Sequence, residues 1–189
     1  MVRQHAPETA WTVSLLDVAP TDRVLELGCG AGRALELAAR QATAGFVAGI
    51  DISRTMVRSA RRRNAQAVAA GRVAVLPGDA TSLPFADRRF DKILSIHSFY
   101  FWPDPLETIK ECCRVLKPGG MIALTLTTSR IGPTGEREIW PVQAVLDEQV
   151  IPGMRAIGFT TAALKSGPDN RQFNSVAVVG VKGGAATGC

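Results

Sequence analysis

Histidine and cysteine are scarce in this chain, and their scarcity removes several classes of site. Among 189 residues there are two histidines and four cysteines. The cysteines are Cys29, Cys112, Cys113 and Cys189, and the histidines are His5 and His97. Because no C-x-x-C pair and no Cys/His cluster at ligand spacing occurs, we expect no structural or catalytic metal. We interpret the cysteines as reduced thiols.

Long apolar stretches are also absent. No run approaches the roughly 18 uncharged residues that a membrane-spanning helix needs. Residues 1–5 lead into Ala6-Pro7-Glu8 rather than into the apolar segment of a signal peptide. We therefore expect a cytoplasmic protein that does not bind a membrane.

The composition excludes a disordered or fibrous chain. A length of 189 residues, with 46% hydrophobic and 21% charged residues, is typical of one globular domain. We expect residues 1–182 to form a single domain. Residues 183–189, which are rich in glycine and alanine, are expected to form a flexible tail.

Acidic residues are fewer than basic ones. The 17 Asp and Glu against 22 Lys and Arg give a formal net charge of +5. Six of the basic residues lie between positions 54 and 72, including the run Arg61-Arg62-Arg63. The segment also has the pattern of a helix with a polar outer face, so a solvated face is the interpretation we favour. A phosphate-binding surface for nucleic acid is the alternative.

Short apolar runs alternate with helical patterns through most of the chain. Strands are expected at residues 23–27, 45–50, 72–76, 90–96 and 121–127. Helices are expected at residues 10–18, 32–40, 54–70 and 104–116. This alternation indicates an α/β fold, a doubly wound Rossmann-like and mainly parallel sheet with helices on both faces. Ligands of such sheets bind at the carboxyl ends of the strands, near the switch point in strand order.

The last third of the chain gives weaker signals. Residues 128–150 lack a clear period and contain two glycines and two prolines. We expect a mobile loop there, of a length suited to a lid, followed by a helix. Two further β-rich segments, near residues 158–160 and 175–181, are expected to add strands.

A glycine-rich turn follows the first expected strand and precedes a helix. Residues 28–32 read Gly-Cys-Gly-Ala-Gly, and glycines there let the backbone approach a ligand closely. A dinucleotide fingerprint needs a third small residue where this chain has Arg33. Glu26 would also repel a pyrophosphate. The turn therefore favours a ligand that carries a cation over NAD.

Five segments in the chain resemble, in order, the motifs of the class I methyltransferases that use S-adenosylmethionine. They are residues 26–32, 48–53, 78–80, 90–94 and 114–120. The first contains the glycine turn, the second places the acidic Asp51 at the end of the second expected strand, and the last reads Arg-Val-Leu-Lys-Pro-Gly-Gly. The resemblance covers roughly residues 20–127. It implies S-adenosyl-L-methionine as cofactor and S-adenosylhomocysteine as product.

The resemblance also implies roles for residues near the turn. Asp51 would accept both ribose hydroxyls of the cofactor, and its alternative role is a helix N-cap, for which Ser53 is also available. Glu26 would orient the amides of the turn and face the methionyl ammonium, directly or through water. Gly28 and Gly30 would supply backbone contacts.

The resemblance also implies which residues would contact the adenine end of the cofactor. Asp79 would accept the adenine amino group while the Ala80 amide meets a ring nitrogen, although Asp79 also suits a plain turn. Ile52 and Met56 would flank the adenine, and for Met56 core packing is the alternative. Cys29 would make a backbone contact as a small filler and not as a nucleophile.

Residues 95–103 lie where the family places the methionyl end and the acceptor, so Ser95 is expected to contact the cofactor. His97 is a candidate general base, with a backbone-organising role as the alternative. Tyr100 is a candidate for positioning the acceptor. The aromatic run 99–102 either lines an apolar substrate pocket or wedges the next helix onto the sheet.

We therefore expect a methyltransferase that acts on a small-molecule acceptor, most readily at oxygen. No Asn/Asp-Pro-Pro-aromatic signature follows the fourth strand, which disfavours methylation of nucleic-acid bases. Two alternatives stay open: an RNA or protein methyltransferase, and a protein that binds S-adenosylmethionine without catalysis. The sequence does not fix the acceptor or the oligomeric state.

Overall fold

The computed structural model describes residues 6–132, 134–140, 142–168 and 173–184. The strands are β1 (Arg23–Leu27), β2 (Phe46–Asp51), β3 (Val73–Pro77), β4 (Phe90–Ile96), β5 (Leu116–Ile131), β6 (Arg137–Ile139), β7 (Phe159–Ser166) and β8 (Phe173–Lys182). The α-helices are α1 (Ala6–Leu15), α2 (Arg33–Gln41), α3 (Arg54–Arg63), α4 (Ala65–Ala69), α5 (Pro105–Val115), α6 (Val142–Val145) and α7 (Ile151–Ile157). A 3₁₀ turn, η1 (Phe99–Phe101), and a π-helical turn, η2 (Leu146–Val150), complete the described elements.

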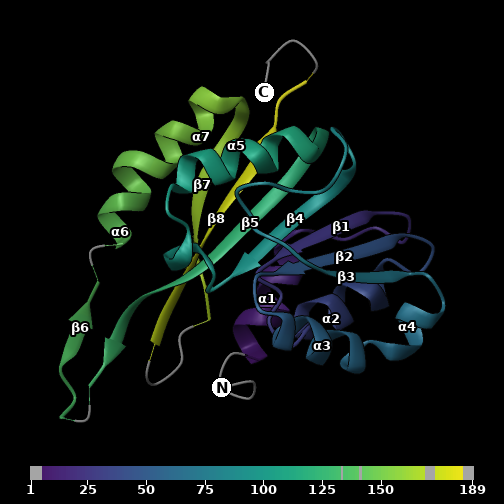
Figure 1. Ribbon diagram of the computed structural model, residues 1–189. Coiled ribbons are helices and arrows are strands. Elements are labelled where there is room, and N and C mark those ends of the chain that lie inside the picture. The colour runs from purple at the N-terminus through teal and green to yellow at the C-terminus, as the bar shows by residue number, and fades with distance from the viewer. Residues whose placement is uncertain (1–5, 133, 141, 169–172, 185–189) are drawn as a thin grey trace.

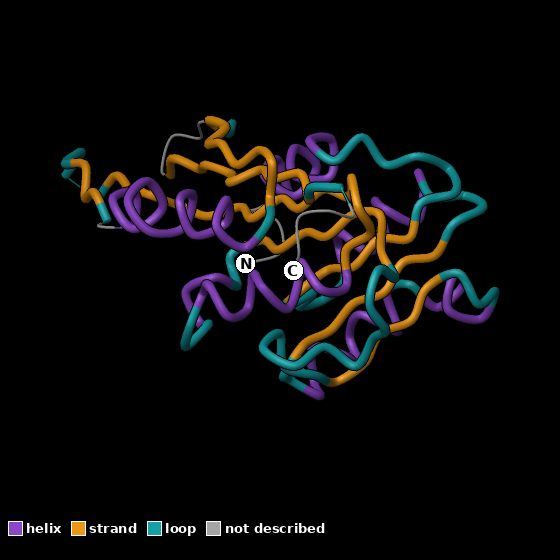
Figure 2. Tube along the Cα trace, turned by 90° about the horizontal axis from the view of Figure 1, so that it is seen from above, coloured by secondary structure: helices purple, strands orange, loops and turns teal. Residues whose placement is uncertain are grey.

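One twisted sheet crosses the whole molecule (Figures 1 and 2). Its strand order is β3-β2-β1-β4-β5-β8-β7, with β6 paired to β5 off this path. The pairs from β3 to β5 are parallel, while β8 runs antiparallel to β5 and β7. The doubly wound, mainly parallel fold is therefore confirmed. The order reverses between β1 and β4, which places the switch point there.

Two apolar clusters lie on the two faces of this sheet. One gathers Phe90 and Ile109 with side chains of α5, η2 and α7, and the other gathers Leu16 and Leu35 with side chains of α1, α2 and α3. Figure 1 shows α5 and α7 on one side of the strands and α2 to α4 on the other. Strands β1, β2 and β4 read as apolar runs because helices cover both of their faces.

Local chemistry fixes where the helices begin and end. The Asp104 side chain accepts hydrogen bonds from the amides of Leu106 (2.9 Å) and Glu107 (3.1 Å), and Pro105 lies in the first turn of α5. The single helix expected at residues 54–70 is wrong. Asn64 divides it into α3 and α4, because its backbone leaves helical geometry with φ −101° and ψ 21°.

The segment 128–150 also differs from its prediction. β5 continues to Ile131 and pairs with β6 in an antiparallel hairpin that projects from the body of the molecule (Figure 1). The expected loop is therefore mostly strand. The sequence did not indicate this hairpin, because it is formed by backbone pairing and its side chains do not alternate between apolar and polar. The helix expected after it is present as α6 and η2. Two residues of this segment, 133 and 141, lie outside the described part of the chain.

The cysteines only partly follow the sequence interpretation. Cys29 and Cys112 are buried free thiols. Cys113 is disulfide-bonded, so the expectation of reduced thiols is wrong for this residue. Sequence spacing gave no sign of the bond, because a disulfide joins residues that only the tertiary structure brings together. The cytoplasmic location stays a prediction.

Two further predictions concern the extent of the domain and membranes. Within the described residues, no helix has the length and apolar character needed to cross a membrane. The division into a domain of residues 1–182 and a tail of residues 183–189 stays a prediction, since residues 185–189 lie outside the described part of the chain.

Candidate cofactor and acceptor site

A cavity of about 460 Å³ opens at the carboxyl ends of β1, β2 and β4. Its lining residues are Gly28, Ile50, Asp51, Ile52, Gly78, Asp79, Ala80, Ile96, His97, Ser98, Phe101, Trp102 and Pro103. The predicted site residues among them are Gly28, Asp51, Ile52, Asp79, Ala80 and His97. The other predicted residues, Glu26, Cys29, Gly30, Met56, Ser95 and Tyr100, are not part of this lining. The structure thus places Asp51 and Asp79, predicted to contact the cofactor, and His97, the predicted base, around one cavity at the switch point of the sheet.

The glycine turn between β1 and α2 needs its glycines for different reasons. Gly28, Gly30 and Gly32 have φ of +64°, +51° and +76°, in the left-handed region that other residues rarely adopt. A Cβ atom on Gly28 would lie 2.5 Å from the Cβ of Ser98. A Cβ on Gly30 would meet nothing within 4 Å. Gly28 therefore permits close packing, whereas Gly30 faces open space that a ligand can occupy.

Asp51, at the end of β2, holds this turn in place. Its carboxylate accepts a hydrogen bond from the Gly30 amide (2.8 Å) with one oxygen and from the Ser53 amide (2.8 Å) with the other. Sequence reasoning did not foresee the link to Gly30. Each carboxylate oxygen keeps further lone-pair capacity, so the expected contact with ribose hydroxyls remains compatible with both bonds.

Ser53 takes the capping role that Asp51 was also suited to. The Ser53 hydroxyl accepts a hydrogen bond from the Met56 amide (3.3 Å) at the start of α3. Asp51 therefore serves as the anchor of the glycine turn rather than as the side-chain cap of α3.

Glu26 is a buried carboxyl group two residues before the turn. Only 4% of the residue is exposed, and within the described residues its Oε2 atom has no hydrogen-bond partner. Burial raises the pKa of Glu26 well above its usual range, the nearby charge of Asp51 raises it further, and the Leu35 amide opposes the shift. A buried carboxylate of this kind is stabilised by a cationic group, so the residue fits the methionyl ammonium that the resemblance implies.

The adenine end has its predicted residues in different states of exposure. Ile52 is 81% exposed while lining the cavity, which suits a side chain that a flat apolar ligand would cover. Asp79 lines the cavity as well, and its Oδ1 accepts the Thr81 amide (2.9 Å), so the turn role is present beside the predicted adenine role. Met56 is 36% exposed and does not line the cavity, so in this structure it belongs neither to the buried core nor to the cavity wall.

His97 lies at the carboxyl end of β4, in an unusual backbone conformation. Its φ is +56°, and its amide donates to the Thr125 carbonyl of β5 (2.9 Å). Positive φ in a residue other than glycine costs conformational energy, and such residues cluster at functional sites. The residue lines the cavity next to Ile96 and Ser98. Its geometry therefore suits both a proton acceptor and an organiser of this strand end.

The aromatic run divides between the two interpretations that the sequence left open. Phe101 and Trp102 line the cavity, with Phe101 81% exposed. Phe99 is buried in the core and packs on Trp102 with ring centroids 5.4 Å apart. The Tyr100 hydroxyl donates to the Thr127 carbonyl (2.7 Å) and accepts from the Thr127 amide (2.6 Å), away from the cavity lining. Burial raises the pKa of Tyr100.

Two small residues show a contact that sequence reasoning missed. Ser95, which was expected to contact the cofactor, is 1% exposed and hydrogen-bonds through its hydroxyl to Ser98. The Ser98 hydroxyl donates a hydrogen bond to the Leu27 carbonyl (3.2 Å), and Ser98 lines the cavity next to Gly28. No pattern singled out Ser98, because its role arises from packing against Gly28.

Cys29 is a buried residue of the glycine turn, and its role as a small filler stays a prediction. Its amide donates to the Ile50 carbonyl (2.9 Å), which ties the glycine turn to β2. Burial, together with the charges of Glu26 and Asp51, raises the pKa of the Cys29 thiol far above its usual range. A thiol held in the neutral form is a poor nucleophile.

Comparison with known proteins places this site in context. Residues 25–124 match the family described as "Methyltransferase domain". The uncharacterised methyltransferase YdaC of Bacillus subtilis is 27% identical over 159 residues, covering 84% of this chain and 83% of the relative. The 27-O-demethylrifamycin SV methyltransferase of Amycolatopsis mediterranei is 39% identical over 112 residues, covering 58% of this chain and 40% of the relative.

Another relative, the ubiquinone/menaquinone biosynthesis C-methyltransferase UbiE of Geotalea daltonii, is 35% identical over 115 residues. That alignment covers 60% of this chain and 49% of the relative, so the chain spans half or less of the length of the last two relatives. Among solved structures, a SAM-dependent methyltransferase from Aquifex aeolicus superposes with a TM-score of 0.71 at 20% identity, covering 94% of this chain and 92% of the other. At that identity the superposition shows the shared fold.

Proposed function

This chain belongs to the class I methyltransferases that use S-adenosylmethionine as methyl donor, and from that premise we propose that it methylates a small-molecule acceptor at an oxygen atom. The cofactor supplies a methyl group bound to a positively charged sulfur. Transfer is an in-line displacement, so the chief task of the protein is to align donor and acceptor and to keep water away.

The observation that carries the proposal is the cavity of about 460 Å³ and its lining. This volume lies within the range of sites for small ligands. Polar groups of Asp51 and Asp79 line one part, and Phe101 and Trp102 line another. Because the cofactor would occupy the part lined by Asp51 and Asp79, the part beside Phe101 and Trp102 is left for the acceptor. An aromatic wall of this kind suits a small apolar or aromatic molecule better than an extended polymer.

We assign the cofactor contacts to the residues that surround or support the turn. Asp51 would accept the ribose hydroxyls, Asp79 and the Ala80 amide would hold the adenine edge, and Ile52 would cover the adenine face. Glu26 would balance the methionyl ammonium, because its buried Oε2 has no partner among the described residues. Backbone contacts would come from Gly28, Cys29 and Gly30.

His97 is our candidate for removing the acceptor proton. It lines the cavity at the end of β4, and imidazole is the side chain that most often acts as general acid or base in enzymes. A phenol or carboxylic acid acceptor ionises without help, and His97 would then contribute alignment alone. Tyr100 is the weaker candidate for contacting the acceptor, since its hydroxyl already donates to and accepts from Thr127.

Oxygen is supported as acceptor atom by the name of the Amycolatopsis relative, a 27-O-demethylrifamycin SV methyltransferase. The Geotalea relative, named as a C-methyltransferase, supports carbon as the alternative. Product analysis separates the two, because a methoxy group and a C-methyl group have distinct chemical shifts in NMR spectra.

The test is an acceptor screen that measures release of S-adenosylhomocysteine from small hydroxylated and carboxylated compounds. Gly30→Val serves as the matched inactive control, since its side chain would enter the open space at the turn. Turnover with a phenol or alcohol, giving a methoxy product, supports the proposal. Tight cofactor binding without turnover on any compound would favour a protein that binds S-adenosylmethionine without catalysis, and turnover on RNA or protein alone would contradict the small-molecule assignment.

A further inference from the structure

The positive charge of the chain is concentrated in one part of the molecule. Residues 33–72, which hold α2, β2, α3 and α4, contain eight arginines against two carboxylates, Glu36 and Asp51. This segment therefore carries a net charge of +6. The other residues, 14 basic and 15 acidic, have a net charge of −1. The basic character of the protein thus belongs to a single helical layer.

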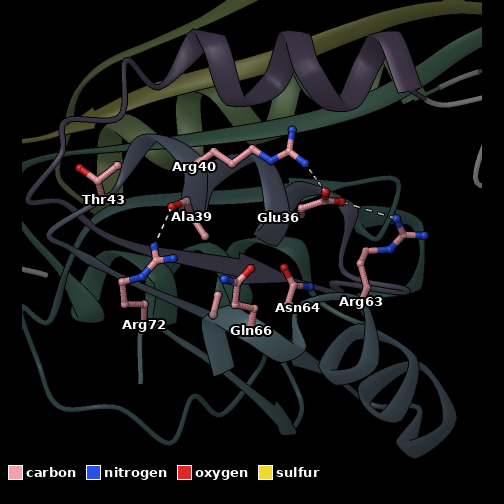
Figure 3. Close-up of a pocket in the computed structure, with 9 residues that line it drawn as sticks. Glu36, Ala39, Arg40, Thr43, Arg63, Asn64, Gln66 and Arg72 are labelled. Carbon is pink, nitrogen blue, oxygen red and sulfur yellow. Dashed lines mark hydrogen bonds and ion pairs between the residues drawn. The ribbon is translucent and has the colours of Figure 1, made fainter. Parts of the chain in front are cut away.

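A second cavity, of about 530 Å³, lies within this layer. Its lining residues are Glu36, Ala39, Arg40, Thr43, Arg63, Asn64, Gln66, Ala67 and Arg72. None of them lines the cofactor cavity. Figure 3 shows two facing rows, one from α2 and the turn after it, the other running from the end of α3 to Arg72. We call this cavity the arginine pocket.

The arginine pocket has more positive than negative charge. Arg40 contacts the Glu36 carboxylate at 2.6 Å and Arg63 contacts it at 3.6 Å, while Arg33 contacts it from outside the pocket at 2.9 Å. Partial burial opposes ionisation of Glu36, yet the hydrogen bond and charge of Arg33 and the charges of the other two arginines lower its pKa. One carboxylate is thus shared by three guanidinium groups, and Arg72 adds a further cation that has no part in this cluster.

Neighbouring carbonyl groups hold these side chains in position. The Arg72 guanidinium donates to the Ala39 carbonyl (3.0 Å), and Arg63 donates through Nε to the Ala31 carbonyl (2.9 Å). Each guanidinium has five N–H donors, so both keep donors for a further partner. Groups that are already ordered lose little conformational entropy when a ligand binds.

We propose that the arginine pocket binds the phosphate group of a small phosphorylated molecule. Arginine forms paired, charge-assisted hydrogen bonds with phosphate, and a phosphate monoester or pyrophosphate carries the negative charge that this pocket lacks. The Thr43 hydroxyl and the Gln66 amide in the lining add neutral donors. A concave site of this volume, with donors on two facing sides, suits a small ligand better than the backbone of a nucleic acid.

The experiment is calorimetric titration of the full chain with inorganic pyrophosphate and with a nucleoside diphosphate. The variants are Arg40→Gln and Arg72→Gln. Arg58→Gln is the matched control, because Arg58 is an exposed arginine of α3 that does not line the pocket. Each pocket variant should weaken binding about tenfold, the scale of one hydrogen bond to a charged group, while the control should change it less than about twofold. Arg40 has a side chain that is 67% exposed, so its substitution tests binding without threatening the fold.

Three results would overturn the proposal. The first is a lack of saturable binding of either ligand at millimolar concentration. The second is equal weakening in Arg58→Gln, which would indicate a diffuse field rather than a pocket. The third is tighter binding of a short single-stranded RNA that depends equally on Arg58 and steeply on salt, which would assign the basic layer to nucleic acid. Titration of each variant with S-adenosylhomocysteine shows whether the cofactor site is intact.

Discussion

Replacing Glu26 by glutamine removes an ionisable group with almost no change in shape. In the protein without cofactor, burial raises the pKa of Glu26 well above its usual range. The unfolded chain releases this proton at about pH 4.3, whereas the folded chain retains it to higher pH. The folded state then binds more protons than the unfolded state, so stability falls as pH rises from about 4.3 to the folded pKa. A glutamine has no such loss.

The size of the effect follows from linkage. A single group contributes at most about 1.4 kcal/mol for each pH unit in this window. For a domain of this length that corresponds to about 3–5 °C in the melting temperature per pH unit. Melting curves of wild type and Glu26→Gln without cofactor should therefore diverge as the pH rises above about 4.3, with the variant gaining relative stability.

Cofactor binding should favour the ionised form of Glu26, whereas burial without cofactor favours the protonated form. The methionyl ammonium would favour ionised Glu26, so S-adenosylhomocysteine should displace a proton when it binds to the wild type. Calorimetry in two buffers of different ionisation enthalpy counts that proton. Glu26→Gln should release none and should bind about 10- to 150-fold more weakly, the scale of one charge-assisted hydrogen bond of 1.5–3 kcal/mol.

Glu36→Gln is the matched control for the pH dependence. Partial burial opposes ionisation of Glu36, but Arg33, Arg40 and Arg63 lower its pKa, so its stabilising effect is present above about pH 4.3 and is lost only below it. Its melting curve should stay parallel to wild type from pH 5 to 8. Parallel curves for Glu26→Gln as well, with unchanged proton release, would refute the argument that the carboxyl is buried and awaits a cation.

Three further substitutions test the rest of the site. Asp51→Ala should weaken S-adenosylhomocysteine binding by about 1.5–3 kcal/mol in calorimetry, and unchanged affinity would remove Asp51 from the site. Gly30→Val should abolish binding while circular dichroism stays native, whereas Gly71→Val, with similarly positive φ and open space, should strain the backbone equally and leave binding intact. His97→Ala should lower turnover about 10²- to 10⁴-fold and flatten the pH profile if His97 is the base, and equal rates across pH 6–9 would leave it a positional role.

Parallel strand order explains why much of the site could be predicted. The carboxyl ends of β1, β2 and β4 meet at one edge of the sheet, so residues placed at strand ends by sequence gather there in space. Asp51 and His97 both line the cavity for this reason. Their exact roles toward cofactor and acceptor stay predictions, because those depend on ligand contacts.

Other features had no periodic signal to reveal them. The continuation of β5 and its hairpin with β6 depend on backbone hydrogen bonds between segments without alternating side chains. The break at Asn64 depends on hydrogen bonds that its side-chain amide donates to the carbonyls of Gly32 and Ala60. Gly32 precedes α2, so the first bond joins two different helices. The disulfide at Cys113 likewise joins groups that the linear pattern does not relate.

The sequence by itself determined the order of the parallel strands β1 to β5, the family and the position of the glycine turn, because apolar period, glycine placement and motif order are local properties. Tertiary structure alone decided which polar groups meet. It brought the Asp51 carboxylate into a hydrogen bond with the Gly30 amide and packed Ser98 against Gly28. It also placed the Tyr100 hydroxyl in a hydrogen bond with Thr127 of β5. It also gathered arginines from α2, from α3 and from the turn before β3 around one pocket. Such contacts are fixed by packing between distant segments, which a local pattern does not encode.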